Sequence, residues 1–113
     1  MSARDSRRVQ TARARLLRFL EETDHVLPGS VVERSLRCGK STCLCHADPP
    51  MLHGPYVQWS CTRANKRFTR WPNADQEERY RPRIEAGRRL RDLIAELEDL
   101  EITAAEAAEG WGA

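Results

Sequence analysis

The amino-acid sequence predicts an α+β fold with an N-terminal helix, a three-stranded antiparallel sheet and a long C-terminal helix. Apolar residues recur with a helical period at both ends of the chain, and they alternate with polar residues in its middle. Clusters of Pro, Gly, Asn and Asp separate these segments. A length of 113 residues suits one small domain. We expect that domain over residues 1–102, with an acidic, Ala- and Glu-rich tail over residues 103–113.

The first helix is expected from Arg4 to Thr23. At about 100° per residue, five apolar side chains gather on one face of it: Val9, Ala12, Leu16, Phe19 and Leu20. Pro28, Gly29 and Ser30 end this element. The segment Val31 to Leu36 then predicts a short strand.

The next two strands are expected to form a hairpin. They cover Tyr56 to Thr62 and Phe68 to Trp71, with a turn at Ala64-Asn65-Lys66. Asn65 is the turn residue best able to take a left-handed conformation. Strand alternation places Val57, Trp59 and Cys61 on one face of the middle strand.

The last helix is predicted to be interrupted. Asp75 to Tyr80 can form a short helical piece, and Pro82 places the start of the regular helix near that residue. Beyond it runs an apolar stripe that we expect to pack on the first helix, with dimerisation as its second possible use. The stripe consists of Ala86, Leu90, Leu93, Ile94, Leu97 and Leu100.

Three cysteines and a histidine form the motif with the clearest chemistry. Cys38, Cys43 and Cys45 fall within eight residues, and His53 follows eight residues after the last of them. Thiolates and an imidazole at this spacing can converge on one tetrahedral Zn²⁺, as a zinc knuckle whose four protein ligands leave no open position. His46 and Cys61 are alternatives to His53 as the fourth ligand. Disulfides or unligated thiols are the alternatives to a metal.

The same stretch resembles a known family. Its pattern is Arg37-Cys38-Gly39-Lys40-x-x-Cys43-x-Cys45, then His53-Gly54-Pro55-Tyr56 and a Trp-containing strand. It is similar to a family of small uncharacterised prokaryotic proteins that is described as a domain of unknown function, over about Gly29 to Leu97. The resemblance implies that Cys38, Cys43, Cys45 and His53 act as one unit, and it leaves Cys61 and His46 outside. It implies no activity.

The charge is distributed unevenly along the chain. The net charge of +2 combines +9 over residues 1–91, which hold all 19 Lys and Arg against 10 Asp and Glu, with −7 over residues 92–113. Such asymmetry favours nucleic-acid contact through the basic part, although a solvated surface is the plainer interpretation. The residues expected to contact phosphates are Arg37, Lys40, Arg63, Lys66, Arg67 and Arg70. DNA is favoured over RNA as the ligand.

Several classes of protein are disfavoured by the sequence. No apolar run approaches the ~18 residues that a membrane span needs, and Arg4, Arg7 and Arg8 lead into an amphipathic segment rather than a secretory signal. We therefore expect a cytoplasmic protein without membrane contact. No arrangement of nucleophile and base predicts an enzyme. The expected function is a zinc-stabilised, nucleic-acid-binding accessory protein, and the alternative is a protein interaction or dimerisation module that uses the two amphipathic helices.

Overall fold

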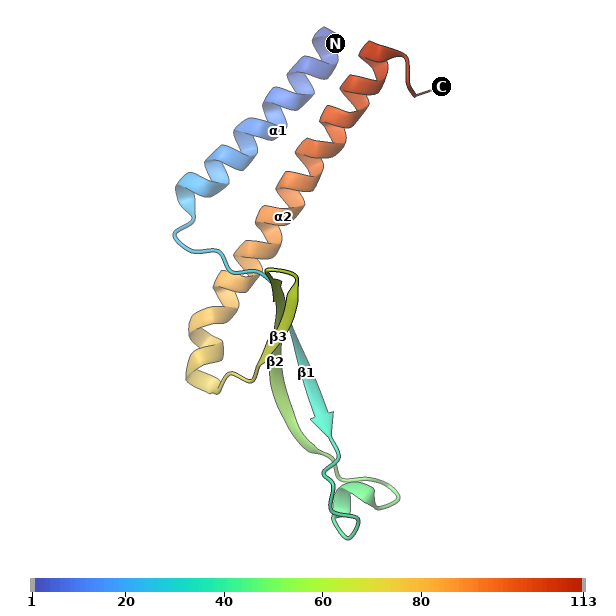
Figure 1. The fold of residues 1–113 in the computed structure, drawn as a ribbon. Helices are drawn as coiled ribbons and strands as arrows, with labels where there is room; N and C mark the ends of the chain where they lie inside the picture. The colour runs from blue at the N-terminus through green and yellow to red at the C-terminus, as the bar shows by residue number, and fades with distance from the viewer. Residues whose placement is uncertain (1, 113) are drawn as a thin grey trace. The chain divides into compact units, whose positions relative to one another are not determined.

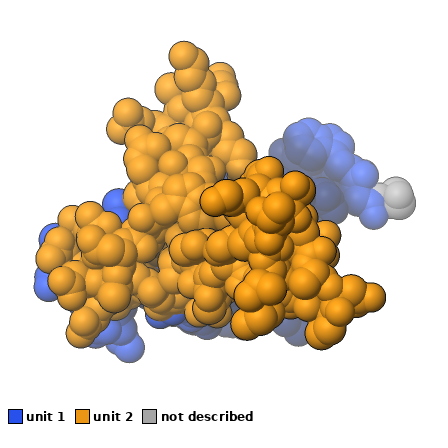
Figure 2. Space-filling view, turned by 90° about the horizontal axis from the view of Figure 1, so that it is seen from below, with its two compact units in different colours: residues 1–27, 85–113 blue, residues 28–84 orange. Residues whose placement is uncertain are grey.

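The computed structural model describes residues 2–112, and its fold is of the predicted α+β class (Figure 1). In chain order the elements are α1 (Ala3–Glu22), β1 (Ser30–Leu36), the short 3₁₀ helix η1 (Leu44–His46), β2 (His53–Arg63), β3 (Lys66–Arg70) and α2 (Ala74–Glu109). The chain divides into two compact units (Figure 2). The helical unit holds the chain up to Leu27 together with the chain from Glu85 onward, and the sheet unit is Pro28–Ile84.

Helix α1 lies within one residue of its predicted bounds at each end. It begins where the Ser2 hydroxyl accepts a hydrogen bond from the Asp5 backbone N–H at 3.0 Å, which satisfies one donor of the first turn. It ends at Glu22, before an extended residue. Its predicted apolar face is only partly covered, because Val9 and Ala12 are buried whereas Leu20 is exposed.

In the helical unit, the Glu85–Glu109 part of α2 contributes Leu93 and Ala104 as buried residues. Arg15 of α1 forms an ion pair with Glu96 of α2, so the two helices are joined at the surface as well. The segment after α1 comes so close that a Cβ at Gly87 would lie 1.9 Å from the backbone oxygen of Leu27. Only glycine fits at this position.

The sheet is antiparallel in the order β1-β2-β3. Val31 lies opposite Trp59, and Cys61 lies opposite Phe68, so the predicted face of the middle strand is continued on both neighbours. This inner face includes the buried Cys61, whereas Tyr56 and Val32 on the outer face are exposed. Ser60 is the exception on the outer face: it is buried, and its hydroxyl shares a hydrogen bond with that of Thr69.

The hairpin turn is tighter than predicted. Arg63 pairs with Lys66, so only Ala64 and Asn65 form the loop, and Lys66 belongs to β3. Asn65 takes the predicted left-handed conformation with φ 63°, and Ala64 does so too with φ 52°. Two successive left-handed residues match the right-handed twist of the flanking strands. Strand β2 also begins three residues earlier than predicted, at His53.

Helix α2 begins at Ala74 rather than near Pro82. The expectation was wrong because a reciprocal cap fixes the start: the Asn73 side chain accepts the Gln76 N–H, and the Gln76 side chain accepts the Asn73 N–H, both at 2.9 Å. Pro82 removes one backbone donor from the helix interior. The helical turns on both sides of it persist, and the helix runs on to Glu109 through much of the predicted tail.

Candidate metal centre and basic hairpin

The cysteine-rich loop connects β1 to β2 and folds back on itself. The Cys43 N–H donates to the Lys40 carbonyl and the His46 N–H donates to the Cys43 carbonyl, each at 3.0 Å. These two turns bring the sulfur atoms of the loop together. His53 joins them because Leu36, at the end of β1, pairs with His53, at the start of β2.

Gly54 is essential to this placement of His53. Its φ of 112° is one that residues with a side chain rarely adopt, and a Cβ there would lie 2.9 Å from the Arg34 carbonyl oxygen. A glycine after His53 therefore allows β2 to start close against β1 while the imidazole faces the loop. Gly54 and Pro55 thus belong to the extended strand β2 and do not form a separate turn.

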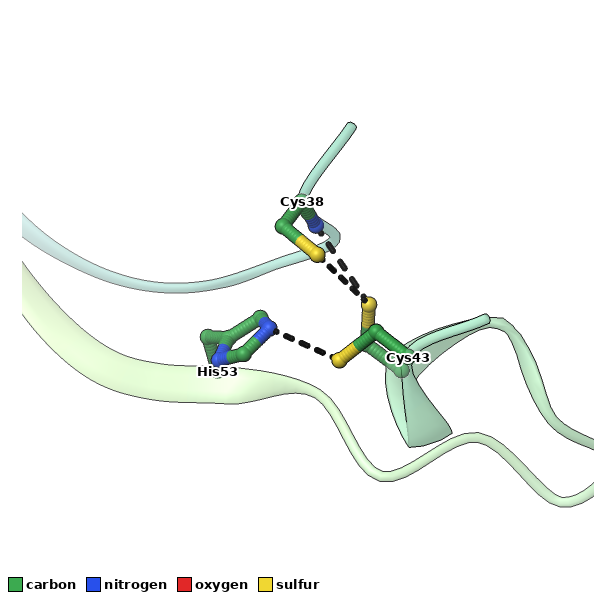
Figure 3. Close-up of side chains that lie close together, drawn as sticks. Cys38, Cys43 and His53 are labelled. Carbon is green, nitrogen blue, oxygen red and sulfur yellow. Dashed lines mark hydrogen bonds between the residues drawn. The ribbon is translucent and has the colours of Figure 1, made fainter. Parts of the chain in front are cut away.

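Cys38, Cys43, Cys45 and His53 form one cluster. Figure 3 shows the side chains of Cys38, Cys43 and His53 close together in it. The ligand atoms of all four residues lie within 4.8 Å of one another. The Sγ atoms of Cys38 and Cys45 are 3.6 Å apart, and Cys43 Sγ lies 3.3 Å from His53 Nε2. All four cysteines of the chain are free thiols. The four groups thus lie close enough to hold a metal ion.

The protein surroundings favour a charged sulfur in this cluster. The Cys38 backbone N–H points at Cys45 Sγ over 3.4 Å, and Cys45 is fully buried. A hydrogen bond from the backbone of Cys45 is the main cause that lowers the pKa of the Cys43 thiol to about 6. Burial acts in the opposite direction on Cys45 and raises the pKa of its thiol. Cys43 is therefore the cysteine best prepared to bind a cation as a thiolate.

The structure places the two alternative ligands elsewhere. His46 Nε2 lies 2.6 Å from the Cys38 backbone oxygen, so its ring braces the loop instead of facing the sulfurs. Cys61 is buried within the sheet opposite Phe68. The bracing role of His46 was missed by sequence reasoning, because a contact to a backbone carbonyl leaves no pattern in the sequence.

The predicted cationic residues lie in two parts of the sheet unit. Arg37 and Lys40 lie in the cysteine-rich loop, whereas Arg63 and Lys66 lie at the other end of β2. Ten residue steps of a strand separate these ends by roughly 33 Å. Arg67 is on the outer face of the sheet. Arg70 is on the inner side, with its guanidinium 4.7 Å from the centre of the Phe68 ring.

A family model described as a domain of unknown function (DUF6788) matches residues 6–82. The chain belongs to this family. The DUF6788 match covers most of α1, the whole sheet and the first turns of α2, so it begins and ends earlier than the expected stretch from Gly29 to Leu97. No curated protein and no solved structure matches the chain. Within residues 2–112, no helix is both long enough and apolar enough to cross a membrane.

Proposed function

We propose that this DUF6788 protein is a zinc-stabilised nucleic-acid-binding accessory protein whose basic hairpin contacts the phosphate backbone. The observation that carries the proposal is the charge of the hairpin from His53 to Arg70, which holds four cations and no Asp or Glu. At its tip Arg63 lies directly opposite Lys66. Like charges opposite each other destabilise a sheet, so stability does not account for this pair. An anionic ligand that binds both cations would account for the pair.

The rest of the sheet unit supports the same ligand class. Residues 28–84 hold ten Lys and Arg against five Asp and Glu, a net charge of +5. All six of the cations predicted to contact phosphates are exposed, including Arg37 and Lys40 beside the cysteine cluster. A surface with this excess attracts polyanions and steers them toward the sheet.

Zinc is the metal that suits the cluster best. Three sulfur donors and one imidazole are the ligands of structural zinc sites, and bonds of about 2.0–2.3 Å place tetrahedral ligands about 3.6 to 3.8 Å apart. Two of the six ligand separations, Cys38 Sγ to Cys45 Sγ at 3.6 Å and Cys43 Sγ to His53 Nε2 at 3.3 Å, are close to these distances, and all six are within 4.8 Å. Four protein ligands leave no place for a substrate, so the ion would hold the ends of β1 and β2 together and would take no part in chemistry.

The test is binding of the zinc-loaded protein to labelled duplex DNA and RNA over a range of salt concentrations. Affinity should fall log-linearly with salt, with a slope of about 0.9 per phosphate contact on duplex DNA. The double change Arg63→Gln and Lys66→Gln should weaken binding and reduce the slope by about 2. The same change should preserve or raise the melting temperature, because it removes the repulsion across the turn.

A matched control removes two exposed cations of α1 by Arg4→Gln and Arg8→Gln. The total charge is then equal to that of the hairpin variant, and affinity should fall much less. The proposal is wrong if the wild type binds neither nucleic acid at low salt, or if the two double variants lose affinity equally.

The second candidate is an interaction or dimerisation module, and one observation favours it. Apolar side chains of the helical unit remain exposed: Leu17 at 50%, Leu20 at 45%, Ile94 at 39% and Ile102 at 55%. A concentration-dependent sedimentation coefficient that is abolished by Leu17→Lys and Ile102→Lys would support this candidate.

A further inference from the structure

The sheet unit contains a hollow with aromatic walls at the end of β3. Its volume is about 330 Å³, at the small end of the range for ligand sites. Six residues line it, and we call it the aromatic hollow: Trp59, Arg70, Trp71, Pro72, Gln76 and Tyr80. They come from β2, the last residue of β3, the connection that follows and the first turns of α2, all within the sheet unit.

The rings around this hollow are held in place by their own contacts. The Trp59 indole N–H donates to the Pro28 carbonyl at 2.8 Å, and the ring meets Phe68 edge to face at 5.8 Å. Trp71 meets Tyr56 edge to face at 6.5 Å, yet it is 52% exposed. A large aromatic surface is thus presented to solvent in a fixed orientation. A planar ligand can stack on such a surface without a large entropic cost.

Two polar groups of the hollow are also preorganised. Arg70 stacks on Phe68 and donates through Nη1 to the Thr69 carbonyl at 3.0 Å, which leaves most of its five N–H donors available. The Gln76 side-chain oxygen caps α2 by accepting the Asn73 N–H, so its amide NH₂ group is left to donate. Donors beside an aromatic wall suit a flat heterocycle with acceptors on its edge.

The charges around the hollow favour a ligand that carries phosphate. Arg79 and Arg83 stack on the Tyr80 ring at 5.7 Å and 5.2 Å. On the same turns of α2, Glu77 forms an ion pair with Arg81, and the exposed Asp75 and Glu78 offset the charges of Arg79 and Arg83. The net positive charge beside the hollow is therefore that of Arg70. Arg70, which lines the hollow, ends the same strand that begins with Lys66 at the hairpin tip. A nucleic-acid strand whose phosphates contacted Lys66 and Arg70 would therefore pass the hollow.

We propose that the aromatic hollow holds one unpaired nucleobase of a single-stranded nucleic acid whose phosphates follow the basic hairpin. This inference rests on the proposed function and deepens it, since it names the form of nucleic acid. A base in a duplex is stacked and paired on its Watson–Crick edge, so it cannot enter a hollow of this size without leaving the helix. A single strand presents its bases freely to aromatic side chains.

The experiment compares two strands of about twelve nucleotides that carry the same number of phosphates. One has abasic residues throughout, and the other has a single base at its centre, with both strands made as DNA and as RNA. Anisotropy on the zinc-loaded full chain should show that the single base strengthens binding about tenfold, the effect of one stacked base. Tighter binding of the strand with the single base, made as DNA or as RNA, supports the proposal. Equal affinity for the two strands, both as DNA and as RNA, overturns the proposal. This comparison needs no variant of the protein.

Variants assign the effect to the hollow. Trp71→Ala should abolish the gain from the single base and leave binding of the abasic strand and zinc content unchanged. Trp71→Phe should keep part of the gain. Trp111→Ala is the matched control, since Trp111 is an exposed tryptophan of the helical unit at 72%, and it should keep the full gain.

The outcomes separate this inference from the proposed function. If the abasic strand binds with a steep salt dependence that Arg63→Gln and Lys66→Gln reduce, while the base adds nothing, the function stands and the inference falls. The inference also falls if Trp71→Ala keeps the full gain, or if a duplex with the same number of phosphates binds as tightly as the base-containing strand. If the wild type binds no strand at all, both fall.

Discussion

His46 and His53 both follow the last cysteine of the loop, but they face different partners. His53 Nε2 lies 3.3 Å from Cys43 Sγ, whereas His46 Nε2 lies 2.6 Å from the Cys38 carbonyl oxygen. Adjacent residues rarely turn inward together, and His46 comes directly after the buried Cys45. The orientation of each ring, and not its distance along the sequence, decides which histidine can bind a metal.

We therefore expect His53→Ala to release the metal and His46→Ala to retain it. The first change removes one of four donors, and the second removes only a brace on the loop backbone. Metal content by elemental analysis and affinity by competition with a chelator measure both effects. Cys61→Ser serves as a further control that should keep the metal. Release by His46→Ala together with retention by His53→Ala would contradict the assignment.

Ala64 is the second informative residue, because its φ of 52° is unfavourable for a residue with a Cβ. A left-handed conformation costs an L-residue about 1–2 kcal/mol, and glycine pays about 0.5–1 kcal/mol in additional chain entropy. Ala64→Gly should thus raise the free energy of unfolding by about 0.5–1 kcal/mol, measured by denaturant titration. Ala95→Gly, on the exposed surface of α2, should instead lower it by about 1 kcal/mol. Destabilisation by both changes would mean that the turn is not as described.

At the scale of elements, the start of α2 depends on two side chains before its first turn. Asn73 and Gln76 satisfy each other's backbone N–H groups at 2.9 Å. This cap also keeps Gln76 and Tyr80 in the aromatic hollow, since both lie in the turns that follow it.

Asn73→Ala should lower the free energy of unfolding by about 1 kcal/mol, because one donor of the first turn loses its partner. Asn73→Asp should keep the stability, since a carboxylate also caps the helix and favours its N-terminus. Thermal or denaturant unfolding measures the stability of both variants. Equal stability of the wild type and Asn73→Ala would show that the helix begins later, near Pro82, as its sequence suggested.

At the scale of the whole molecule, the candidate metal cluster and the tip of the basic hairpin lie at opposite ends of β2. The cysteine-rich loop has little apolar material to hold it, with Leu44 and Met51 exposed at 63% and 65%. We therefore expect its folded form to depend on a metal ion at the Cys38, Cys43, Cys45 and His53 cluster far more than the hairpin tip does.

Removal of the metal with a chelator should unfold the loop first and lower the melting temperature, because metal binding free energy contributes to folding. Amide exchange should increase most between Cys38 and His53 and less between β2 and β3. Cys43→Ser should reproduce this pattern in the presence of zinc. An unchanged exchange pattern after complete removal of the metal would contradict a structural role for the ion.

The features that the sequence alone determined are those set by near neighbours in the chain. The 3.6-residue period of α1, the alternation that places Trp59 and Cys61 on one face, and the turn at Asn65 all depend on local geometry. The spacing of Cys38, Cys43 and Cys45 belongs to the same class, because a few turns suffice to bring them together.

Only the tertiary structure decided which groups from distant segments meet. His53 reaches the sulfurs through its pairing with Leu36, 17 positions earlier in the sequence. The aromatic hollow joins Trp59 to Tyr80 across 21 positions of the sequence. Contacts of this kind depend on strand register and helix placement, which arise from the packing of the whole sheet unit and leave no periodic signal in the chain.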